Sequence, residues 1–283
     1  MIQYYFYKIG QFFVQHLPLS LTYKIASFLS DVHYYLSFRD RRNVKNNLKA
    51  ILPASSDFGH LSREVFRNFA RYLVDFFYVP GKLNEAYIRE HVTIKNLHYL
   101  PDVLKKGKGG IILTAHIGNW ELGGFIVSRL GYPLIAVALP HKERSINNLF
   151  NSQRQSQGIT IVPNNVGIRE CVRGLKNNRM IALLGDRDFN ATGEMMDFLG
   201  KKARMPKGPA AFSLKTGAPI IPAFLTRDDE NRFTLIFEEP IFPPEDPENP
   251  RALKEMMRKY ITTIEKAVYR SPTQWYMFQR FWL

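Results

Sequence analysis

Cysteine is almost absent from this sequence, since Cys171 is the only one among 283 residues. A single thiol forms no internal disulfide and no cysteine-based zinc site, which favours a reducing, cytosol-facing location. Four common signatures are also missing: G-x-S-x-G, H-E-x-x-H, G-x-x-x-x-G-K-[ST] and G-x-G-x-x-G. Their absence argues against a nucleophile-elbow hydrolase, a zinc protease, a P-loop NTPase and a Rossmann enzyme.

Acidic residues are scarce relative to basic ones. The chain has 25 Asp and Glu against 39 Lys and Arg, which gives a net charge of +14 and a pI near 9.8. This imbalance predicts an anionic partner, such as nucleic acid, a phospholipid surface, a phosphorylated substrate or an acidic protein. The chain is 45% apolar and 13% aromatic, so it can bury a sizeable core and is not globally disordered.

The N-terminus lacks a long apolar run. Its longest uncharged stretch, residues 9–23, has 15 residues and is interrupted by polar side chains and a proline. A helix needs about 20 mostly apolar residues to span a bilayer, so this stretch is too short for a confident span. A cleavable signal peptide also fits poorly, because no basic start and no small-residue cleavage site flank it.

Aromatic rings and a following basic cluster instead favour an interfacial anchor. Residues 1–38 hold 11 aromatic residues and only three charges, and such rings prefer the depth of lipid headgroups. The cluster that follows suits an anionic cytoplasmic leaflet and consists of Arg39, Arg41, Arg42, Lys45 and Lys49. We expect residues 1–82 to form a helical section with a membrane anchor. The alternative is an aromatic-rich helical pair packed on the core.

From residue 83 onward, short apolar runs alternate with helix-like segments. The runs that predict strands are 111–115, 134–139, 159–162, 180–184, 220–225 and 233–237. The intervening helices are expected at 119–130, 144–157, 166–177, 206–216 and 251–269, and another is expected at 62–79. Short strands that are apolar on both faces indicate an α/β fold, with a mostly parallel central sheet flanked by helices, over residues 83–283.

The segment GIILTAHIGNWELGG, residues 110–124, carries the most chemical information. His116 follows an apolar strand directly, and active sites of open α/β sheets lie at the carboxyl ends of strands. The H-x4-E spacing brings Glu121 across the strand-to-helix turn, where a carboxylate can bond one ring nitrogen while the other faces a substrate. This arrangement is typical of an oriented general base. Gly118 allows a tight turn and a close backbone approach.

This segment resembles the active-site motif of the bacterial lipid A biosynthesis acyltransferases, the lauroyl and myristoyl transferases within the lysophospholipid acyltransferase superfamily. Three further blocks resemble the same family in order, at residues 39–53, 185–224 and 271–282. The resemblance covers nearly the whole chain. It implies a glycerolipid-acyltransferase-like fold with an N-terminal membrane-associated section.

The resemblance also implies a reaction. A fatty acyl chain moves from a thioester donor, acyl carrier protein or CoA, to a hydroxyl of a lipid A precursor or a similar anionic glycolipid, such as a mannosylated phosphoinositide. No cofactor and no metal are expected, and the location is the bacterial inner membrane with the catalytic domain facing the cytoplasm. Because no serine or cysteine elbow suggests an acyl-enzyme, we expect a single displacement. His116 removes the hydroxyl proton and Glu121 fixes its tautomer.

Four residues are expected to bind substrate: Asn119, Arg154, Asp186 and Arg204. Backbone N–H groups near Gly118–Asn119, or Arg154, supply donors for the oxyanion. Asp186 ends a strand at the same sheet edge as His116, and either holds Arg154 or contacts substrate. Arg204 belongs to a basic run that binds acceptor phosphates or the acidic helix of a carrier protein, unless it is a solvated face.

Two other functions compete with acyl transfer. A thioesterase would use the same His–Glu pair on water, so only its products distinguish it. A nucleic-acid-binding protein would explain the positive charge, but the sequence has no recognisable module, and we expect no nucleic-acid partner. Aromatic residues of 62–79 and 275–282 supply a groove for the acyl chain, although core packing explains them equally well.

Overall fold

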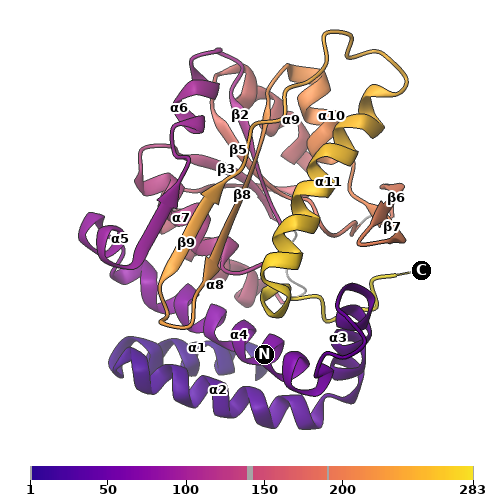
Figure 1. The fold of residues 1–283 in the computed structure, drawn as a ribbon. Helices are drawn as coiled ribbons and strands as arrows, with labels where there is room; N and C mark the ends of the chain where they lie inside the picture. Colours follow the sequence, from indigo (N-terminus) through magenta and orange to yellow (C-terminus); the bar gives the residue numbers. More distant parts are fainter. Residues whose placement is uncertain (1, 139–142, 190, 283) are drawn as a thin grey trace.

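The computed structural model describes residues 2–138, 143–189 and 191–282. The first four helices lie together at one end of the molecule (Figure 1). They are α1 (Ile2–His16), α2 (Leu19–Leu36), α3 (Phe38–Ile51) and α4 (Phe58–Tyr78). Helix α4 contacts each of the other three and also contacts the α/β part of the chain.

A seven-stranded sheet forms the centre of the α/β part, in the order β1-β9-β8-β2-β5-β3-β4. Only the neighbours β8 and β9 run antiparallel, and every other pair is parallel. The bounds are β1 Val92–Lys95, β2 Gly110–Thr114, β3 Leu134–Ala138, β4 Thr160–Pro163, β5 Met180–Leu184, β8 Ile220–Arg227 and β9 Phe233–Phe237. The expected α/β class with a mostly parallel sheet is confirmed.

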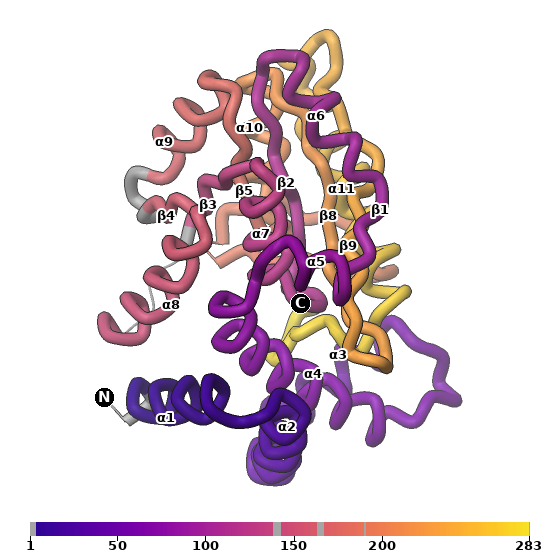
Figure 2. The backbone as a smooth tube through the Cα atoms, turned by 90° about the vertical axis from the view of Figure 1, so that its left-hand side faces the viewer, coloured from indigo at the N-terminus to yellow at the C-terminus, as the bar shows by residue number. Residues whose placement is uncertain are grey.

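Helices cover both faces of this sheet, because its central strands are apolar on both sides. On β2, Ile111 and Leu113 belong to one buried cluster with Ile264 of α11, whereas Ile112 belongs to a second cluster with Phe125 of α7. The helices of the α/β part are α5 (Glu85–His91), α6 (Tyr99–Leu104), α7 (Trp120–Arg129), α8 (Arg144–Ser156), α9 (Asn164–Lys176), α10 (Gly208–Thr216) and α11 (Ala252–Arg270). Figure 2 shows the strands spread from β4 on the left to β1 on the right, and Figure 1 shows α7 on one side of the sheet and α10 and α11 on the other.

The sequence reading misses two features of the sheet region. One is the edge strand β1, and the other is a separate hairpin of β6 (Glu194–Phe198) and β7 (Lys201–Met205). The hairpin is polar and exposed along much of its length, so it lacks the apolar run of a central strand. Its turn consists of Leu199 and Gly200, both with positive φ, as a two-residue hairpin turn requires. Residue 139 of the expected strand 134–139 lies outside the described residues.

The N-terminal helices share their core with the α/β part. Val65 and Phe66 of α4 lie in the same buried cluster as Ile111 of β2. Asn47 of α3 donates hydrogen bonds to the carbonyls of Met277 and Gln279, each at 2.8 Å. The packing is therefore continuous across residue 82, the boundary expected from the sequence.

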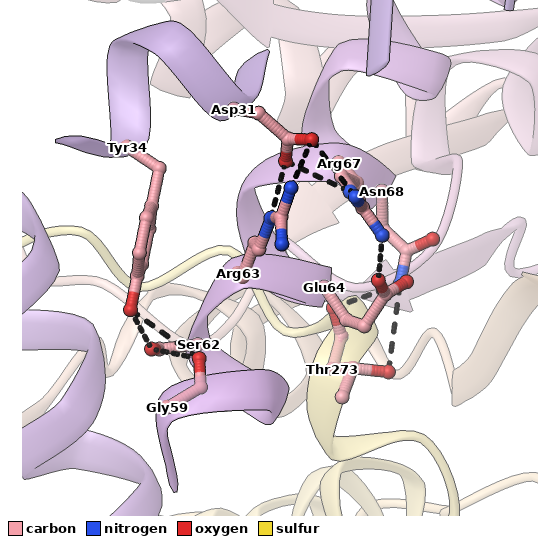
Figure 3. A network of polar contacts seen from close by, with 9 residues as sticks. All are labelled: Asp31, Tyr34, Gly59, Ser62, Arg63, Glu64, Arg67, Asn68 and Thr273. Carbon is pink, nitrogen blue, oxygen red and sulfur yellow. Dashed lines mark hydrogen bonds and ion pairs between the residues drawn. The ribbon is translucent and has the colours of Figure 1, made fainter. Parts of the chain in front are cut away.

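Asp31 of α2 joins this helix to α4 through two arginines (Figure 3). Arg63 donates from Nε at 2.7 Å and from Nη2 at 2.5 Å, and Arg67 donates from the same two atoms at 2.8 Å each. These hydrogen bonds from the two guanidinium groups hold the pKa of Asp31 well below its usual range. Further along α4, Asn68 donates to the carbonyl of Thr273 at 3.2 Å and so reaches the C-terminal tail.

The outer side of the N-terminal helices remains apolar and exposed. Among its most exposed side chains, Leu36 is 73% accessible, and Phe6 and Phe38 are each 70% accessible. The exposed set comprises Tyr5, Phe6, Ile9, Phe12, Phe13, Leu21, Ile25, Phe28, Leu29, Val32, Tyr35, Leu36 and Phe38. Monomeric soluble domains rarely expose an apolar surface of this extent. No helix in the described ranges has both the length and the hydropathy needed to cross a bilayer.

Replacing Asp31 by Asn is expected to lower the free energy of unfolding by about 1 kcal/mol at neutral pH, because two bidentate charge-assisted contacts are lost. Asp31 has a lowered pKa in the folded state, so its contribution is complete above the unfolded value and declines as the pH falls below about 4. Thermal melts of both proteins between pH 7 and 3 test this. A stability difference that widened in acid would contradict it.

Candidate active site

His116 and Asp186 meet because two neighbouring strands end in register. β2 and β5 pair in parallel with Thr114 opposite Leu184. His116 follows Thr114 by two residues, and Asp186 follows Leu184 by the same two. Side chains at the carboxyl ends of adjacent parallel strands share one edge of the sheet. The register therefore brings the imidazole and the carboxylate together.

Asp186 holds His116 through both of its oxygens. Its Oδ1 lies 2.8 Å from His116 Nδ1, and its Oδ2 accepts the backbone N–H of His116 at 3.1 Å. Trp275 of the C-terminal tail donates its indole N–H to Oδ2 at 3.2 Å. The Asp186 side chain is fully buried, whereas that of His116 is 13% exposed. Buried Asp186 thus holds the His116 ring, which itself remains partly exposed to solvent.

The ionised state of Asp186 determines the tautomer of His116. Burial acts to raise the pKa of Asp186, but the charge and hydrogen bonds of His116, together with the charge of Arg187, outweigh burial and lower the pKa to about 2. An ionised carboxylate only accepts hydrogen bonds, so Nδ1 of the neutral ring carries the proton. Nε2 then has a free lone pair, which is the form of imidazole that can act as a base.

The hydrogen-bond partners of Glu121 and Asp186 differ from those expected: Glu121 binds Arg154, and Asp186 binds His116. Both oxygens of Glu121 accept hydrogen bonds from Arg154, at 3.0 and 3.2 Å from Nε and at 2.5 Å from Nη2. Glu121 lies in the first turn of α7 and is 7% exposed, and Arg154 comes from α8. Among the hydrogen bonds of the described residues, none joins Glu121 to His116. The expectation that Glu121 orients the imidazole is therefore corrected, because Asp186 makes that contact.

Arg154 has a further contact beside Glu121. Its Nη1 donates to Asn151 Oδ1 at 3.1 Å, and the guanidinium lies over the ring of Phe150 at 5.9 Å. Burial alone would lower the pKa of Arg154, but the charge of Glu121 and its hydrogen bonds raise it. Arg154 is thus a charged group whose main partner is the Glu121 carboxylate of the protein itself.

The backbone N–H groups of residues 117–119, in the turn after His116, all donate to carbonyl groups of the protein. Ile117 donates to the carbonyl of Ala115 at 2.7 Å, Gly118 to that of Gln274 at 2.9 Å, and residue 119 to the carbonyl of Leu225 at 2.8 Å. Gly118 has φ +58°, and a Cβ there would lie 1.9 Å from the Leu225 carbonyl oxygen. Only glycine fits this approach. The donors expected near Gly118 therefore hold the turn together.

Asn119 caps helix α7 and does not face outward. Its Oδ1 accepts the N–H of Leu122 at 3.0 Å, and its Nδ2 donates to Asp75 at 2.9 Å. The residue is 3% exposed. The expected contact of its side chain with substrate is replaced by this capping role, which satisfies one free N–H of the helix.

The first N–H groups of α7 are the open donors beside His116. Within the described part of the chain, Trp120 and Glu121 have no hydrogen-bond acceptor for their backbone N–H. Helix N-termini carry partial positive charge and bind anions. These two N–H groups are therefore the candidate oxyanion donors, two residues beyond the expected position.

Aromatic side chains surround the imidazole. Trp120 lies 5.1 Å from the His116 ring and stacks on Tyr72 of α4 at 4.4 Å between ring centroids. Phe189 lies 6.2 Å from the His116 ring and is 54% exposed. The backbone N–H of Tyr276 donates to the His116 carbonyl at 2.9 Å. Tyr72 and Tyr276 belong to the two segments expected to hold an acyl chain.

The C-terminal tail is the part of the site that sequence reasoning misses as positioning structure. An isolated antiparallel bridge pairs Ile117 with Trp275. Gln274 and Tyr276, on either side of Trp275, bond the turn as described above. Arg187, which follows strand β5, donates to the Tyr276 carbonyl and so helps to hold the tail in place. The sequence shows the family-like ending, but nothing in it indicates this contact with the turn after His116.

Arg204 lies away from this cluster of contacts. It is on the hairpin strand β7 and donates to the Gly193 carbonyl at 3.3 Å. Its neighbour Lys202 pairs with Asp197 across the hairpin, and Lys201 lies over the ring of Trp282 at 5.9 Å. Lys201, Lys202 and Arg204 therefore lie on strand β7, and Lys207 precedes the first residue of α10.

Within the described residues, no group of three His, Cys, Asp or Glu could hold a metal ion.

Comparisons with known proteins agree on one family. The family model described as bacterial lipid A biosynthesis acyltransferase matches residues 1–283. A phosphatidylinositol mannoside acyltransferase of Mycolicibacterium smegmatis is 27% identical over 76% of this chain and 72% of its own length. The protein of the same name from Mycobacterium tuberculosis is 30% identical over 69% of this chain, and the match spans 64% of its own length.

A lipid A biosynthesis acyltransferase of Haemophilus influenzae is 23% identical over 92% of this chain and 84% of its own length. Acyltransferases whose names refer to two different lipids therefore align with the chain. The family match itself extends over the whole sequence, including the N-terminal helices and the C-terminal tail. This chain belongs to the bacterial lipid A biosynthesis acyltransferase family.

Proposed function

We propose that this protein transfers a fatty acyl chain from a thioester donor to a hydroxyl group of a glycolipid at a membrane surface, with His116 as the general base. The observation that carries the proposal is the contact of the Asp186 carboxylate with His116 Nδ1 at 2.8 Å, which leaves Nε2 without a hydrogen-bond partner among the described residues, in a side chain that is 13% exposed. The family membership supports the reaction class.

In the proposed reaction, His116 Nε2 takes the proton of the acceptor hydroxyl as its oxygen attacks the thioester carbonyl. Asp186 stabilises the imidazolium that forms, as the acid of a catalytic triad does. The C–O bond forms and the C–S bond breaks, and the leaving thiolate receives the proton back from the imidazolium. A base positioned in this way contributes roughly 10²- to 10⁴-fold to the rate.

The negative charge on the carbonyl oxygen requires donors fixed in advance. The N–H groups of Trp120 and Glu121 at the start of α7 are the best candidates, because the other N–H groups of the turn have internal partners. We propose that Glu121 contributes through Arg154: the pair fixes α7 against α8 and so fixes the direction of those donors. Arg154 and Glu121 then act as positioning residues.

The acceptor reaches this site from a lipid surface. We propose that the exposed apolar face of α1, α2 and the start of α3 rests in the headgroup region, with basic residues of α3 against anionic lipids. Tyr4 and Tyr7, expected as lipid-facing rings, instead pack against the protein, and Tyr7 contacts Phe77 and Phe150. The location that follows is the cytoplasmic face of a bacterial inner membrane.

The proposed acyl donor and acceptor are based on the positive charge of the protein and on the names of its relatives. We propose acyl carrier protein or acyl-CoA as donor and an anionic glycolipid as acceptor, with Arg204 and its neighbours as the surface that meets phosphate or an acidic helix. The named acceptors of the relatives, lipid A precursors and phosphatidylinositol mannosides, are the first two to assay.

The central experiment incubates the protein with acyl thioester and glycolipid and measures both products by mass spectrometry. We expect acylated glycolipid from the wild type, and a loss of roughly 10³-fold or more in His116→Ala and Asp186→Asn, since each removes the oriented base. Full transfer by His116→Ala would contradict the proposal. Release of free fatty acid with no acylated lipid would identify a thioesterase instead.

Pairs of substitutions test which residues act together. Asp186→Asn and Glu121→Gln are expected to lower kcat/KM independently, so their effects on the activation free energy add. Glu121→Gln and Arg154→Gln remove one shared contact, so the double variant is scarcely worse than either single variant. Strong non-additivity between Asp186→Asn and Glu121→Gln would instead show that Glu121 acts on the His116–Asp186 pair.

Vesicle sedimentation tests the membrane-facing surface. The triple variant Phe28→Ser, Leu36→Ser and Phe38→Ser is expected to bind anionic phospholipid vesicles at least about tenfold more weakly, because each large apolar side chain is worth about 1.5–3 kcal/mol when removed from water. The control Ile168→Ser with Phe242→Ser removes exposed apolar residues elsewhere and should bind normally. Equal losses in both variants, or none in either, would refute the assignment of this surface.

A further inference from the structure

A second buried ion pair lies beneath the catalytic turn, outside the groups used above. Asp75 of α4 is completely buried, and Arg227 at the end of β8 is 8% exposed and pairs with it. Burial raises the pKa of Asp75, against the opposing effect of the Arg227 charge. The guanidinium also lies over the rings of Tyr23 at 5.0 Å and Phe233 at 4.6 Å.

The Asp75 carboxylate joins three other elements of the fold. Its Oδ1 accepts the hydroxyl of Tyr23 from α2 at 2.6 Å, and its Oδ2 accepts Nδ2 of Asn119 at 2.9 Å. Arg227 donates from Nη1 to the Tyr23 oxygen at 2.9 Å. Tyr23, Asp75, Arg227 and Asn119 therefore form one closed network from helix α2 to the turn that follows His116.

Arg227 also reaches the turn through its backbone. Its N–H donates to Gln274 Oε1 at 2.9 Å, and its carbonyl accepts Gln274 Nε2 at 2.7 Å. The carbonyl of Gln274 in turn accepts the N–H of Gly118. The side chain of Arg227 thus fixes Asn119 through Asp75, while its backbone fixes Gly118 through Gln274.

Attachment of the helices alone does not account for this network. Asp31 already joins α2 to α4 at the part-buried edge of the same interface, with no contact to the turn (Figure 3). A buried ion pair carries a large desolvation cost, and apolar residues of similar volume often give equal stability. A fully hydrogen-bonded buried network does, however, select one geometry among close alternatives. The geometry selected here is that of the catalytic turn.

We propose that Tyr23, Asp75 and Arg227 are positioning residues for the acyl transfer proposed above. They hold the turn at Gly118 and Asn119, and thereby the direction of the His116 ring and of the α7 N-terminus. Helix α2 carries part of the exposed apolar face on its outer side and Tyr23 on its inner side. The inference rests on the proposed function, because its effect on kcat can be measured only if the protein catalyses acyl transfer.

The test compares Tyr23→Phe with Asp31→Asn as a matched control. Both variants remove hydrogen bonds between α2 and α4, but only the first touches the network that reaches Asn119. Tyr23→Phe keeps the ring over Arg227. We expect kcat to fall by roughly tenfold in Tyr23→Phe, about the factor for one hydrogen bond to a charged group, with the donor KM unchanged. Asp31→Asn should keep the wild-type kcat even if it melts lower.

Hydrogen exchange gives a reading that does not depend on activity. The backbone amides of residues 117–123 should exchange faster in Tyr23→Phe than in Asp31→Asn or the wild type, while those of β2 remain unchanged. Asp75→Asn should show the same pattern more strongly, provided that it folds. If no acyl transfer is found in the wild type, the proposed function fails, and exchange still tests the network by itself.

Two results would overturn the inference. One is a wild-type kcat in Tyr23→Phe with unchanged amide exchange in residues 117–123. The other is an equal loss of kcat in Asp31→Asn, which would mean that any weakening between α2 and α4 has this effect. A fall in kcat and faster exchange confined to Tyr23→Phe and Asp75→Asn would support it.

Discussion

The parallel pairing of β2 with β5 is the constraint on which the site depends. Because Thr114 stands opposite Leu184, the residues two positions further along each strand meet as His116 and Asp186. A shift of one position in this register would separate them and turn the side chains of the shifted strand to the opposite face. The same apolar packing that stabilises the centre of the sheet therefore aligns the proposed base with its carboxylate partner.

Local patterns in the sequence predict that His116 and Asp186 end strands at one sheet edge, but not that they contact each other. The apolar run before His116 and the capped helix after it predict a strand end with a functional turn. They do not say which strand lies beside β2, since strand order depends on contacts between residues far apart in the chain. Glu121 is near His116 in sequence and is therefore the partner that local spacing suggests, whereas Asp186 is 70 residues away.

The same limit applies to the supports around the turn. The sequence predicts the longer helices, the central strands and the apolar N-terminal surface, because each depends on periodicity within one segment, whereas the short helices α5 and α6 are not predicted. The roles of Trp275 and Gln274 depend on where the tail returns, and the edge strand β1 and the polar hairpin β6–β7 lack an apolar pattern. The sequence suggests a ligand role for Asn119, because recognising it as the cap of α7 needs the helix start to be placed within one residue.

These contacts form one account of how the chain works. In the proposed mechanism, the N-terminal helices present an apolar surface outward and hold the turn after His116 from within, and the C-terminal tail closes over the same turn. The turn then presents an imidazole of one tautomer and the first N–H groups of α7 to the substrates. The orientation of that imidazole depends on Asp186 and not on Glu121.

The measurement that tests this most directly is the ¹⁵N NMR spectrum of the His116 ring at a pH where the imidazole is neutral. The account predicts a protonated Nδ1 in the wild type and in Glu121→Gln, with loss of this single tautomer in Asp186→Asn. An unchanged tautomer in Asp186→Asn together with its loss in Glu121→Gln would contradict the account.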